Sequence, residues 1–252
     1  MDFSQCCAIV GSASFDAGHF LREYDAGAFA CVVAADGGFA SLEAAGVMPD
    51  VALGDFDSLG YEPDAPVVER HPVMKDETDL ELALMWAHRR GFPSAAVYGA
   101  LGGRLDQTMA TLQTLVHFAR AGMCVAAVGE GYVVAVLSSG KAGSLAPANM
   151  VSNETQEEGR VDTAAVPSPC ASLDLPGGLE GIVSVCAMGG DARVTERGLL
   201  YEVEGFMLAC DSSRGVSNEF TGRAAHIEVA EGDALVFLPA LSLCALSDKN
   251  PV

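Results

Sequence analysis

Four short segments in the first half of the chain combine acidic, glycine and basic residues in patterns that suit the binding of a metal ion and of phosphates. They are Ala34-Ala35-Asp36-Gly37-Gly38, Gly54-Asp55-Phe56-Asp57-Ser58, Lys75-Asp76-Glu77-Thr78-Asp79 and Gly99-Ala100-Leu101-Gly102-Gly103-Arg104-Leu105-Asp106. Mg²⁺ usually binds one or two protein carboxylates and completes its shell with phosphate oxygens and water. Glycines let backbone N–H groups approach a phosphate, and lysine or arginine balances its charge. These segments therefore indicate metal-assisted chemistry on the phosphates of a nucleotide.

Each segment also has a simpler interpretation when it is taken alone. Asp36 could cap the helix that follows it, and Asp55 with Asp57 could form an acidic β-turn. Asp76 or Thr78 could cap a helix in a similar way. The fourth segment could be a surface turn that carries an ordinary ion pair between arginine and aspartate. No single segment separates a metal site from these alternatives.

The elements that would position these segments are apolar strands and amphipathic helices. Short apolar runs predict strands buried on both faces at Cys7–Val10, Ala30–Ala34, Val51–Leu53, Ala95–Tyr98 and Cys124–Val128. Apolar residues at helical spacing, followed by glycine, predict helices at Glu77–Arg90 and Leu105–Ala121. Strands that alternate with helices are typical of a parallel, doubly wound α/β domain, which we assign to residues 1–137.

All four segments follow predicted strands and precede predicted helices, which places them at one edge of the sheet. Open α/β sheets bind their ligands at this edge. Asp36, Asp55, Asp57 and Asp79 would repel one another there without a cation, so the joint arrangement predicts a metal site. Mg²⁺ is the expected ion. We expect Asp55 and Asp57 to carry it, and Asp36 and Asp79 to complete its inner or outer shell.

Residues 138–252 follow a different pattern. The stretch 138–180 is polar and contains several serine, glycine and proline turns, so it marks a boundary or an expanded loop. Beyond it, short segments separated by Gly, Asp and Ser predict antiparallel strands at Ile182–Cys186, Arg193–Glu196, Leu199–Glu204, Phe206–Cys210, Ala225–Val229 and Ala234–Leu238. We predict a smaller, antiparallel β-sandwich domain over residues 138–252.

Charge and composition restrict the possible partners. With 34 acidic and 14 basic residues, the chain carries a formal charge of -20, which repels nucleic acid and anionic membranes, so neither is an expected partner. No segment approaches the roughly 20 apolar residues of a membrane span, and the start lacks a secretory pattern, so we expect a cytoplasmic protein. The eight cysteines show no paired CxxC spacing, which indicates neither a zinc ribbon nor a disulfide scaffold, and we interpret them as buried free thiols.

The motifs occur in the order DGG, GDFDS, KDxTD, GGRLD and SNE, and this order resembles the thiamine pyrophosphokinase family over residues 8–238. The resemblance implies an enzyme that uses Mg²⁺ to transfer a diphosphate from ATP to the hydroxyethyl oxygen of thiamine, releasing AMP. It also implies a homodimer in which thiamine lies between the α/β domain of one subunit and the sandwich of the other.

The resemblance further implies roles for individual residues. The implied metal ligands are Asp36, Asp55, Asp57 and Asp79. The implied ATP-binding residues are Asp36, Gly37, Gly38, Lys75, Gly102, Gly103, Arg104 and Asp106. The implied catalytic residues are Asp57, Lys75 and Asp79, of which Asp79 would orient the thiamine hydroxyl or accept its proton. The implied thiamine-binding residues are Tyr201, Ser217 and Asn218.

The sequence departs from the family pattern in two places. Where the family commonly has histidine after GGRxD and then an asparagine, this chain has Gln107 and, further along, Thr111. Its connection over residues 138–180 is also longer and more polar. Alternative functions are a dehalogenase-like phosphohydrolase with Asp55 as nucleophile and Asp57 as acid, a pyrophosphokinase for a pterin alcohol, and a protein that binds thiamine or a nucleotide without catalysis.

Overall fold

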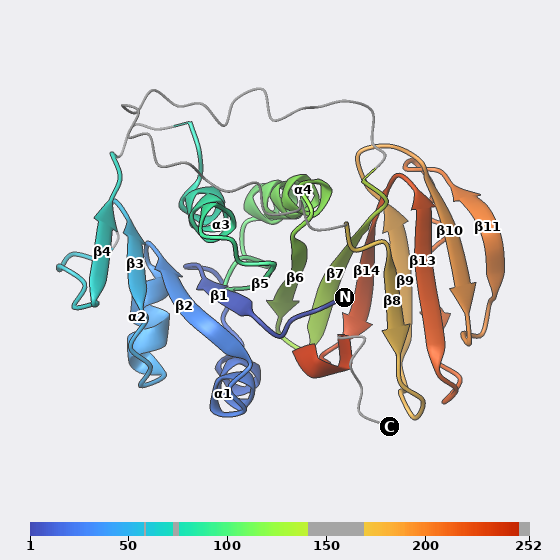
Figure 1. Ribbon diagram of the computed structural model, residues 1–252, viewed down its shortest axis with the longest axis horizontal. Coiled ribbons are helices and arrows are strands. Elements are labelled where there is room, and N and C mark those ends of the chain that lie inside the picture. Colours follow the sequence, from blue (N-terminus) through green and yellow to red (C-terminus); the bar gives the residue numbers. More distant parts are fainter. Residues whose placement is uncertain (58, 73–75, 141–168, 247–252) are drawn as a thin grey trace.

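The computed structural model describes residues 1–57, 59–72, 76–140 and 169–246. Its largest element is a ten-stranded sheet (Figure 1). Its strand order is β12-β9-β14-β7-β6-β5-β1-β2-β3-β4. Six strands are parallel: β1 (Cys6–Val10), β2 (Phe29–Ala35), β3 (Val51–Gly54), β4 (Val67–Arg70), β5 (Ser94–Tyr98) and β6 (Cys124–Gly129). Antiparallel pairing then adds β7 (Tyr132–Ser138), β14 (Asp233–Pro239), β9 (Ile182–Ala187) and β12 (Asn218–Glu219).

Helices cover both faces of the parallel part of this sheet. The helices α1 (Ala17–Asp25) and α2 (Gly38–Ala44) lie on one face, and α3 (Asp79–Arg89) and α4 (Leu105–Arg120) lie on the other (Figure 1). Successive side chains of a strand point to opposite faces, so Ala8 and Val10 pack in the core beside α1 and α2, whereas Cys7 and Ile9 pack beside α3 and α4. This double burial explains why the central strands are apolar throughout.

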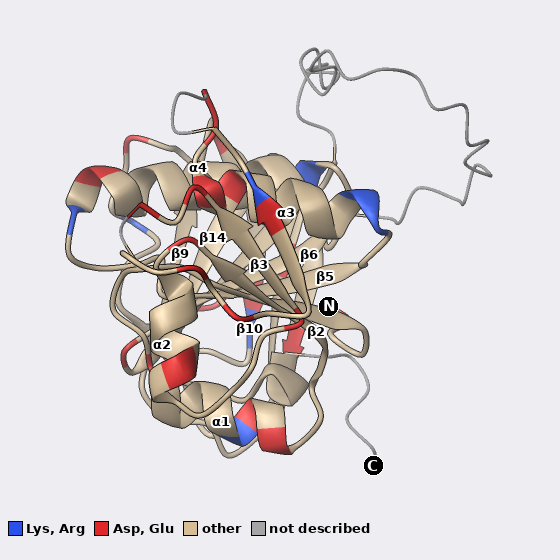
Figure 2. Cartoon of the chain, turned by 90° about the vertical axis from the view of Figure 1, so that its left-hand side faces the viewer, with Lys and Arg blue, Asp and Glu red and all other residues tan. Residues whose placement is uncertain are grey.

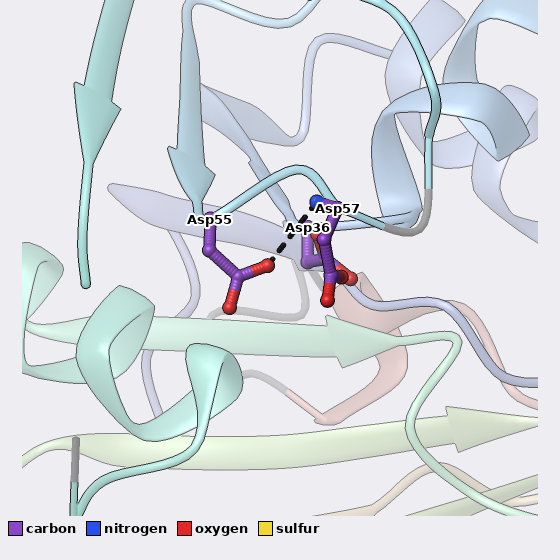
Figure 3. A group of neighbouring side chains, drawn as sticks. All are labelled: Asp36, Asp55 and Asp57. Carbon is purple, nitrogen blue, oxygen red and sulfur yellow. Dashed lines mark hydrogen bonds between the residues drawn. The ribbon is translucent and has the colours of Figure 1, made fainter. Parts of the chain in front are cut away.

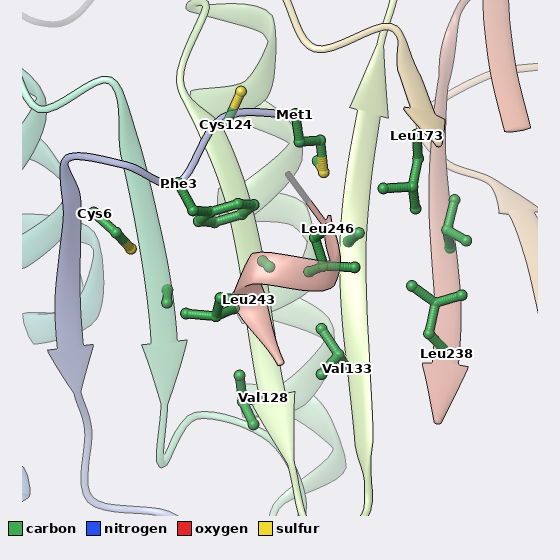
Figure 4. Close-up of a cluster of buried hydrophobic side chains, with 14 of the residues drawn as sticks. Met1, Phe3, Cys6, Cys124, Val128, Val133, Leu173, Leu238, Leu243 and Leu246 are labelled. Atoms are coloured by element: carbon green, nitrogen blue, oxygen red, sulfur yellow. The ribbon is translucent and has the colours of Figure 1, made fainter. Parts of the chain in front are cut away.

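A separate four-stranded antiparallel sheet covers the other end of the molecule. Its order is β11-β10-β13-β8, formed by β8 (Ser172–Leu175), β10 (Ala192–Arg197), β11 (Val203–Leu208) and β13 (Ala225–Glu231). Leu173 of this sheet and Val133 and Leu238 of the large sheet belong to the same buried cluster (Figure 4). A short 3-10 helix, η1 (Leu243–Leu246), adds further apolar side chains to that cluster. The two sheets therefore form a sandwich.

The predicted fold class, a doubly wound α/β domain followed by an antiparallel sandwich, is confirmed. One predicted strand, 199–204, is wrong: Leu199 makes only an isolated bridge to Phe220, and β11 begins at Val203. Gly198 has a φ of 77°, in the left-handed region, and turns the chain there instead. The boundary at residue 137 stays a prediction, and strands from both sides of it share the large sheet.

The prediction that all eight cysteines are free thiols is wrong for two of them. Cys124, at the start of β6, forms a disulfide with Cys170, which lies two residues before β8, and their Cα atoms are 5.8 Å apart. The two are separated by 46 residues in sequence, so no local spacing pattern marks them. Cys6, Cys7, Cys31, Cys186, Cys210 and Cys244 are free.

Acidic residues outnumber basic ones by 34 to 14. Figure 2 marks acidic residues on α1, α2, α3 and α4, and basic residues at fewer positions. Among the described residues, no helix has the length and apolar composition needed to cross a membrane.

Candidate active site

The candidate site lies where the strand order of the large sheet reverses. After β1, the chain places β2, β3 and β4 on one side of that strand, and β5 and β6 on the other. Open α/β sheets bind ligands at such a switch point, beyond the carboxyl ends of the strands. A cleft of about 540 Å³ lies there, which we call the switch-point cleft. It is lined by residues 11–14, 35–36, 78–80, 99–100, 102–104, 107 and 110–111.

Three predicted metal ligands lie together beside this cleft (Figure 3). Asp36 follows β2, and Asp55 and Asp57 follow β3; one carboxylate oxygen from each lies within 4.8 Å of the other two. Asp55 and Asp57 are further joined by a hydrogen bond of 3.2 Å, which the backbone N–H of Asp57 donates to Oδ1 of Asp55. Asp36 also lines the cleft, so it connects the group of carboxylates to the cavity. We call these three side chains the carboxylate triad.

The triad suits a hard divalent cation. Two oxygens bound to Mg²⁺, each at about 2.1 Å, lie at most about 4.2 Å apart, so the observed separations need only small side-chain rotations. All the donors are oxygen atoms, which is the ligand type that Mg²⁺ prefers. Asp36 and Asp55 are partly buried and Asp57 is exposed, which leaves one side open to phosphate oxygens and water.

The backbone that carries the triad is unusual. Asp36 has a φ of 46° and Phe56 a φ of 60°, both in the left-handed region that residues other than glycine seldom adopt. Phe56 is buried, so the chain between the two acidic residues is anchored in the core. Such conformations cost roughly 1–3 kcal/mol each and persist where the surrounding structure enforces them, often at functional sites.

Glycines allow the loops of the site to pack closely. A Cβ atom at Gly38 would lie 1.9 Å from the carbonyl oxygen of Val10, so α2 can begin directly against the end of β1 only with glycine there. A Cβ atom at Gly54 would lie 3.0 Å from the Cα atom of Asp36. The loops after β1, β2 and β3 are therefore held against one another by backbone contact.

Asp79 lines the switch-point cleft from the side of α3, of which it is the first residue. The helix cap is Thr78, whose hydroxyl accepts a hydrogen bond of 3.1 Å from the backbone N–H of Glu81. Capping therefore does not account for Asp79. In the same way, Gly37 and not Asp36 is the cap residue of α2. Lys75, the predicted phosphate ligand, lies outside the described residues.

The glycine-rich loop after β5 supplies the opposite wall of the cleft. Gly102, Gly103 and Arg104 line it, as predicted from their position between a strand and a helix. The Arg104 guanidinium is held by two hydrogen bonds to the carboxylate of Asp106, at 2.6 and 3.2 Å, and this pairing holds the pKa of Asp106 below its usual range. The ordinary ion pair considered as an alternative therefore exists, at the rim of the cleft.

The two residues that depart from the family pattern also line the cleft. Thr111 is buried, and its hydroxyl donates a 3.1 Å hydrogen bond to the carbonyl oxygen of Ala100, which fixes the glycine-rich loop. Gln107 is exposed on the same wall. Residues 11–14, the loop after β1, were missed by sequence reasoning although they line the cleft. Their only signal was their place directly after an apolar strand.

The predicted thiamine-binding residues lie in another part of the molecule. Asn218 belongs to β12, the edge strand five positions from β5 in the large sheet, which corresponds to about 24 Å at the usual strand spacing. None of Tyr201, Ser217 and Asn218 lines the switch-point cleft. Within one described chain, the structure therefore does not bring the predicted thiamine and metal residues together.

The side chain of Asn218 is committed to the protein itself. Its amide nitrogen donates to Glu196, at 2.9 Å, and to the carbonyl oxygen of Tyr201, at 2.8 Å. Its oxygen accepts from the backbone N–H groups of Tyr201 and Glu219, both at 2.9 Å. Ser217 precedes it with a φ of 64°. Asn218 thus shapes the loop that presents Tyr201, a residue that is 66% exposed. The contact of Tyr201 and Asn218 with thiamine stays a prediction.

Glu196 beneath this loop is expected to make stability depend on pH. Burial raises the pKa of its carboxyl group, because desolvation disfavours the charged form more than the hydrogen bond from Asn218 favours it. The protonated Glu196 carboxyl therefore favours the folded state. Its contribution to the free energy of unfolding is complete below the unfolded-state pKa and is lost as the pH rises through the higher folded-state pKa. Glu196→Gln keeps an oxygen that accepts from Asn218 and removes the charge. We expect its free energy of unfolding to exceed that of wild type at neutral pH, with the difference shrinking towards acid pH.

Urea unfolding of both proteins at several pH values measures this difference. The exposed Glu180 offers a matched control, because Glu180→Gln removes the same charge without a burial effect. A difference between Glu196→Gln and wild type that does not change with pH would contradict the prediction.

The fold and the site together define a two-domain protein in which an α/β domain presents a carboxylate triad beside a ligand cleft and a sandwich follows it. Residues 27–127 match the model of the thiamin pyrophosphokinase catalytic domain, and residues 173–232 match the model of the thiamin pyrophosphokinase vitamin B1 binding domain. The two models together cover more than half of the chain in the expected order. The chain belongs to the thiamine pyrophosphokinase family.

Individual relatives agree with this assignment. A thiamine pyrophosphokinase of Bacillus subtilis is 36% identical over 89 residues, which span 33% of this chain and 42% of that protein. Thiamin pyrophosphokinase 1 of Caenorhabditis elegans is 28% identical over 202 residues, 75% of this chain and 69% of that one. The crystal structure of thiamine pyrophosphokinase from Bacillus subtilis superimposes with a TM-score of 0.70 at 19% identity, covering 93% of this chain and 99% of that chain, and so supports the fold.

Proposed function

We propose that the protein transfers a diphosphate group from ATP to the hydroxyethyl oxygen of thiamine, with Mg²⁺, and releases AMP. The observation that carries this proposal is the carboxylate triad at the rim of the switch-point cleft, in a chain of this family. A cation held there would neutralise triphosphate charge next to a cavity that is large enough for part of a nucleotide. The chain's own acidity makes a cation necessary, because the substrate phosphates are also anionic.

The reaction requires an alcohol to attack the β-phosphorus in line with the leaving AMP, so alignment and charge neutralisation dominate. Bound Mg²⁺ would withdraw charge from the phosphate oxygens. Asp36, Asp55 and Asp57 would hold it, and Asp79 would orient the thiamine hydroxyl or accept its proton. Gly102 and Gly103 line the cleft, and their backbone would approach the phosphates.

Arg104 and Lys75 are proposed to offset the charge that develops on the bridging oxygen. To do so, the Arg104 guanidinium would bind a phosphate oxygen in addition to Asp106 or in place of it. The side chains of Arg104 and Asp106 are both exposed, so this exchange disturbs no buried group.

A second copy of the chain would complete the site. The predicted thiamine residues lie about 24 Å from the cleft along the sheet, beyond the reach of one small substrate in a single chain. β12, its neighbour β9 and the loops beside them expose several large apolar residues, a feature typical of protein interfaces: Ile182, Leu200, Tyr201 and Val216. We propose that this surface packs on a partner in a homodimer. A stable monomer in size-exclusion chromatography at micromolar concentration would contradict this.

Incubation of the protein with ATP, Mg²⁺ and thiamine tests the proposed reaction, with nucleotides and thiamine esters separated by chromatography. We expect AMP and thiamine diphosphate to appear in equal amounts. Free phosphate without thiamine diphosphate would favour the phosphohydrolase alternative. A rise in melting temperature with thiamine or ATP, but no product, would favour the binding protein. Replacing thiamine by a pterin alcohol tests the remaining alternative.

A further inference from the structure

Two cysteines face one another across the first two strands of the sheet. The parallel register of β1 and β2 places Cys7 directly opposite Cys31. Both side chains belong to the buried cluster beside α3 and α4, so they leave the sheet on the same face. Cys6 belongs to the cluster on the opposite face and cannot compete for the same partner. The register of the two strands is irregular between Cys6 and Cys7, which loosens the ladder next to the pair.

The spacing of the pair is compatible with a covalent bond. Residues opposite each other on neighbouring strands are about 4.8 Å apart, and disulfides join residues whose Cα atoms are roughly 4.4–6.8 Å apart. The two thiols interact, and each changes the pKa of the other. No large backbone movement is therefore needed to join them.

The two sulfurs are chemically different. Cys31 is 9% exposed, whereas Cys7 is fully buried, so a small reagent reaches Cys31 first. The hydrogen bond from Cys7 lowers the pKa of Cys31, and the positive charge of Arg90 acts in the same direction, against burial and the carboxylate of Asp50. The same hydrogen bond and its burial raise the pKa of Cys7. The thiolate is the reactive form of cysteine, so Cys31 is the nucleophile of the pair.

We propose that Cys7 and Cys31 form an oxidisable dithiol that closes to a disulfide between β1 and β2 when the protein meets hydrogen peroxide. The Cys31 thiolate attacks one peroxide oxygen; an S–O bond forms, the O–O bond breaks, and the departing hydroxide takes a proton and leaves as water. Cys7 then loses its proton and attacks the Cys31 sulfur, forming the S–S bond as the S–O bond breaks and a second water leaves. The two sulfurs lose two electrons in total, and the peroxide gains them.

The bond would join the two strands that lead into the candidate site. The loop of residues 11–14 follows β1, and Asp36 follows β2. The usual spacing of neighbouring strands, about 4.8 Å, lies at the short end of the range for disulfides, and strained disulfides are the more easily reduced. We therefore expect reversal by dithiothreitol. This proposal stands apart from the proposed reaction, because it concerns residues at the other end of the same strands.

Peptide mapping tests the proposal on the full chain. The protein is treated with hydrogen peroxide, its remaining thiols are alkylated, and it is digested with trypsin without reduction. We expect peptide 1–22, which contains Cys6 and Cys7, to be joined to peptide 23–70, which contains Cys31, with the mass loss of two hydrogen atoms. The joined species should disappear after dithiothreitol.

Two matched variants decide which cysteine is the partner. Cys7→Ser should abolish the joined peptides, and Cys6→Ser, the same change one residue away, should leave them. Joined peptides that persist in Cys7→Ser would overturn the assignment. Wild-type protein in which the exposed Cys210 and Cys244 are oxidised while peptides 1–22 and 23–70 stay separate would overturn the proposal as a whole. Circular dichroism of each variant establishes that it is folded.

Discussion

Asp36→Asn is expected to reduce kcat/KM for the proposed diphosphate transfer by on the order of a thousandfold, equivalent to about 4 kcal/mol of transition-state stabilisation. Asp36 is the member of the carboxylate triad that also lines the switch-point cleft, so its loss affects both the cation and the phosphates that the cation would hold. Asparagine removes the negative charge but tolerates the left-handed backbone that Asp36 adopts, with a φ of 46°. The loop should therefore keep its shape while the site loses its ligand.

The Mg²⁺ dependence of the reaction separates loss of the ion from loss of the fold. We expect Asp36→Asn to need a higher Mg²⁺ concentration for half-maximal rate, and its thermal unfolding to stay close to that of wild type. Asp25→Asn is the charge-matched control, because Asp25 is exposed at the end of α1, outside the residues that line the cleft. An Asp36→Asn protein with wild-type rate and wild-type Mg²⁺ dependence would rule out the triad as the metal site.

Gly38→Ala is expected to cause the largest loss of stability of the changes considered, by about 3 kcal/mol or more. The added Cβ atom would lie 1.9 Å from the carbonyl oxygen of Val10 and 3.1 Å from the amide nitrogen of Gly11. Both contacts are with backbone, and Val10 is held by β2 on one side and β5 on the other, so the strand cannot move away cheaply. Relief of the clash requires α2 to shift, and with it the neighbouring Asp36.

Gly18→Ala provides the opposite outcome for the same chemical change. Gly18 is the second residue of α1, and a Cβ atom there would have its nearest neighbour at 3.5 Å, an ordinary contact. Alanine favours the helix over glycine by roughly 1 kcal/mol, so this variant should be as stable as wild type or more so. Urea unfolding followed by fluorescence of the single tryptophan, Trp86, measures both variants. Equal stabilities for Gly38→Ala and Gly18→Ala would contradict the prediction, because they would show that the backbone of Val10 and Gly11 moves aside at little cost in free energy.

The sequence predicted five of the six parallel strands, because these five are buried on both faces. β1 consists of apolar residues followed by glycine, and β5 has the same pattern after Ser94, its first residue. Few other structures produce this pattern. β4 was missed because it is an edge strand of four residues whose side chains are largely exposed. The exposed edge removes the hydrophobic signal that marks a strand.

The candidate site was predictable where charged residues carry it. Asp36, Asp55 and Asp57 stand out at the ends of apolar strands, and the structure brings them together. The hydrogen bonds by which Asn218 holds the loop of Tyr201 were not predictable, since its partners Glu196 and Tyr201 are 22 and 17 residues away in sequence. Nor was the Cys124–Cys170 disulfide, because its spacing depends on how the sandwich packs.

The continuous sheet restricts how the protein can close around a substrate. β7 pairs with β6 on one side and with β14 on the other, so a ladder of hydrogen bonds crosses from the α/β part into the sandwich. Bending between the two parts would break that ladder, so we expect no hinge between them in the part of the chain that the structure describes. Its two halves are expected to move as one body, so the loops at the strand ends and the partner subunit of the proposed homodimer would have to provide substrate capture.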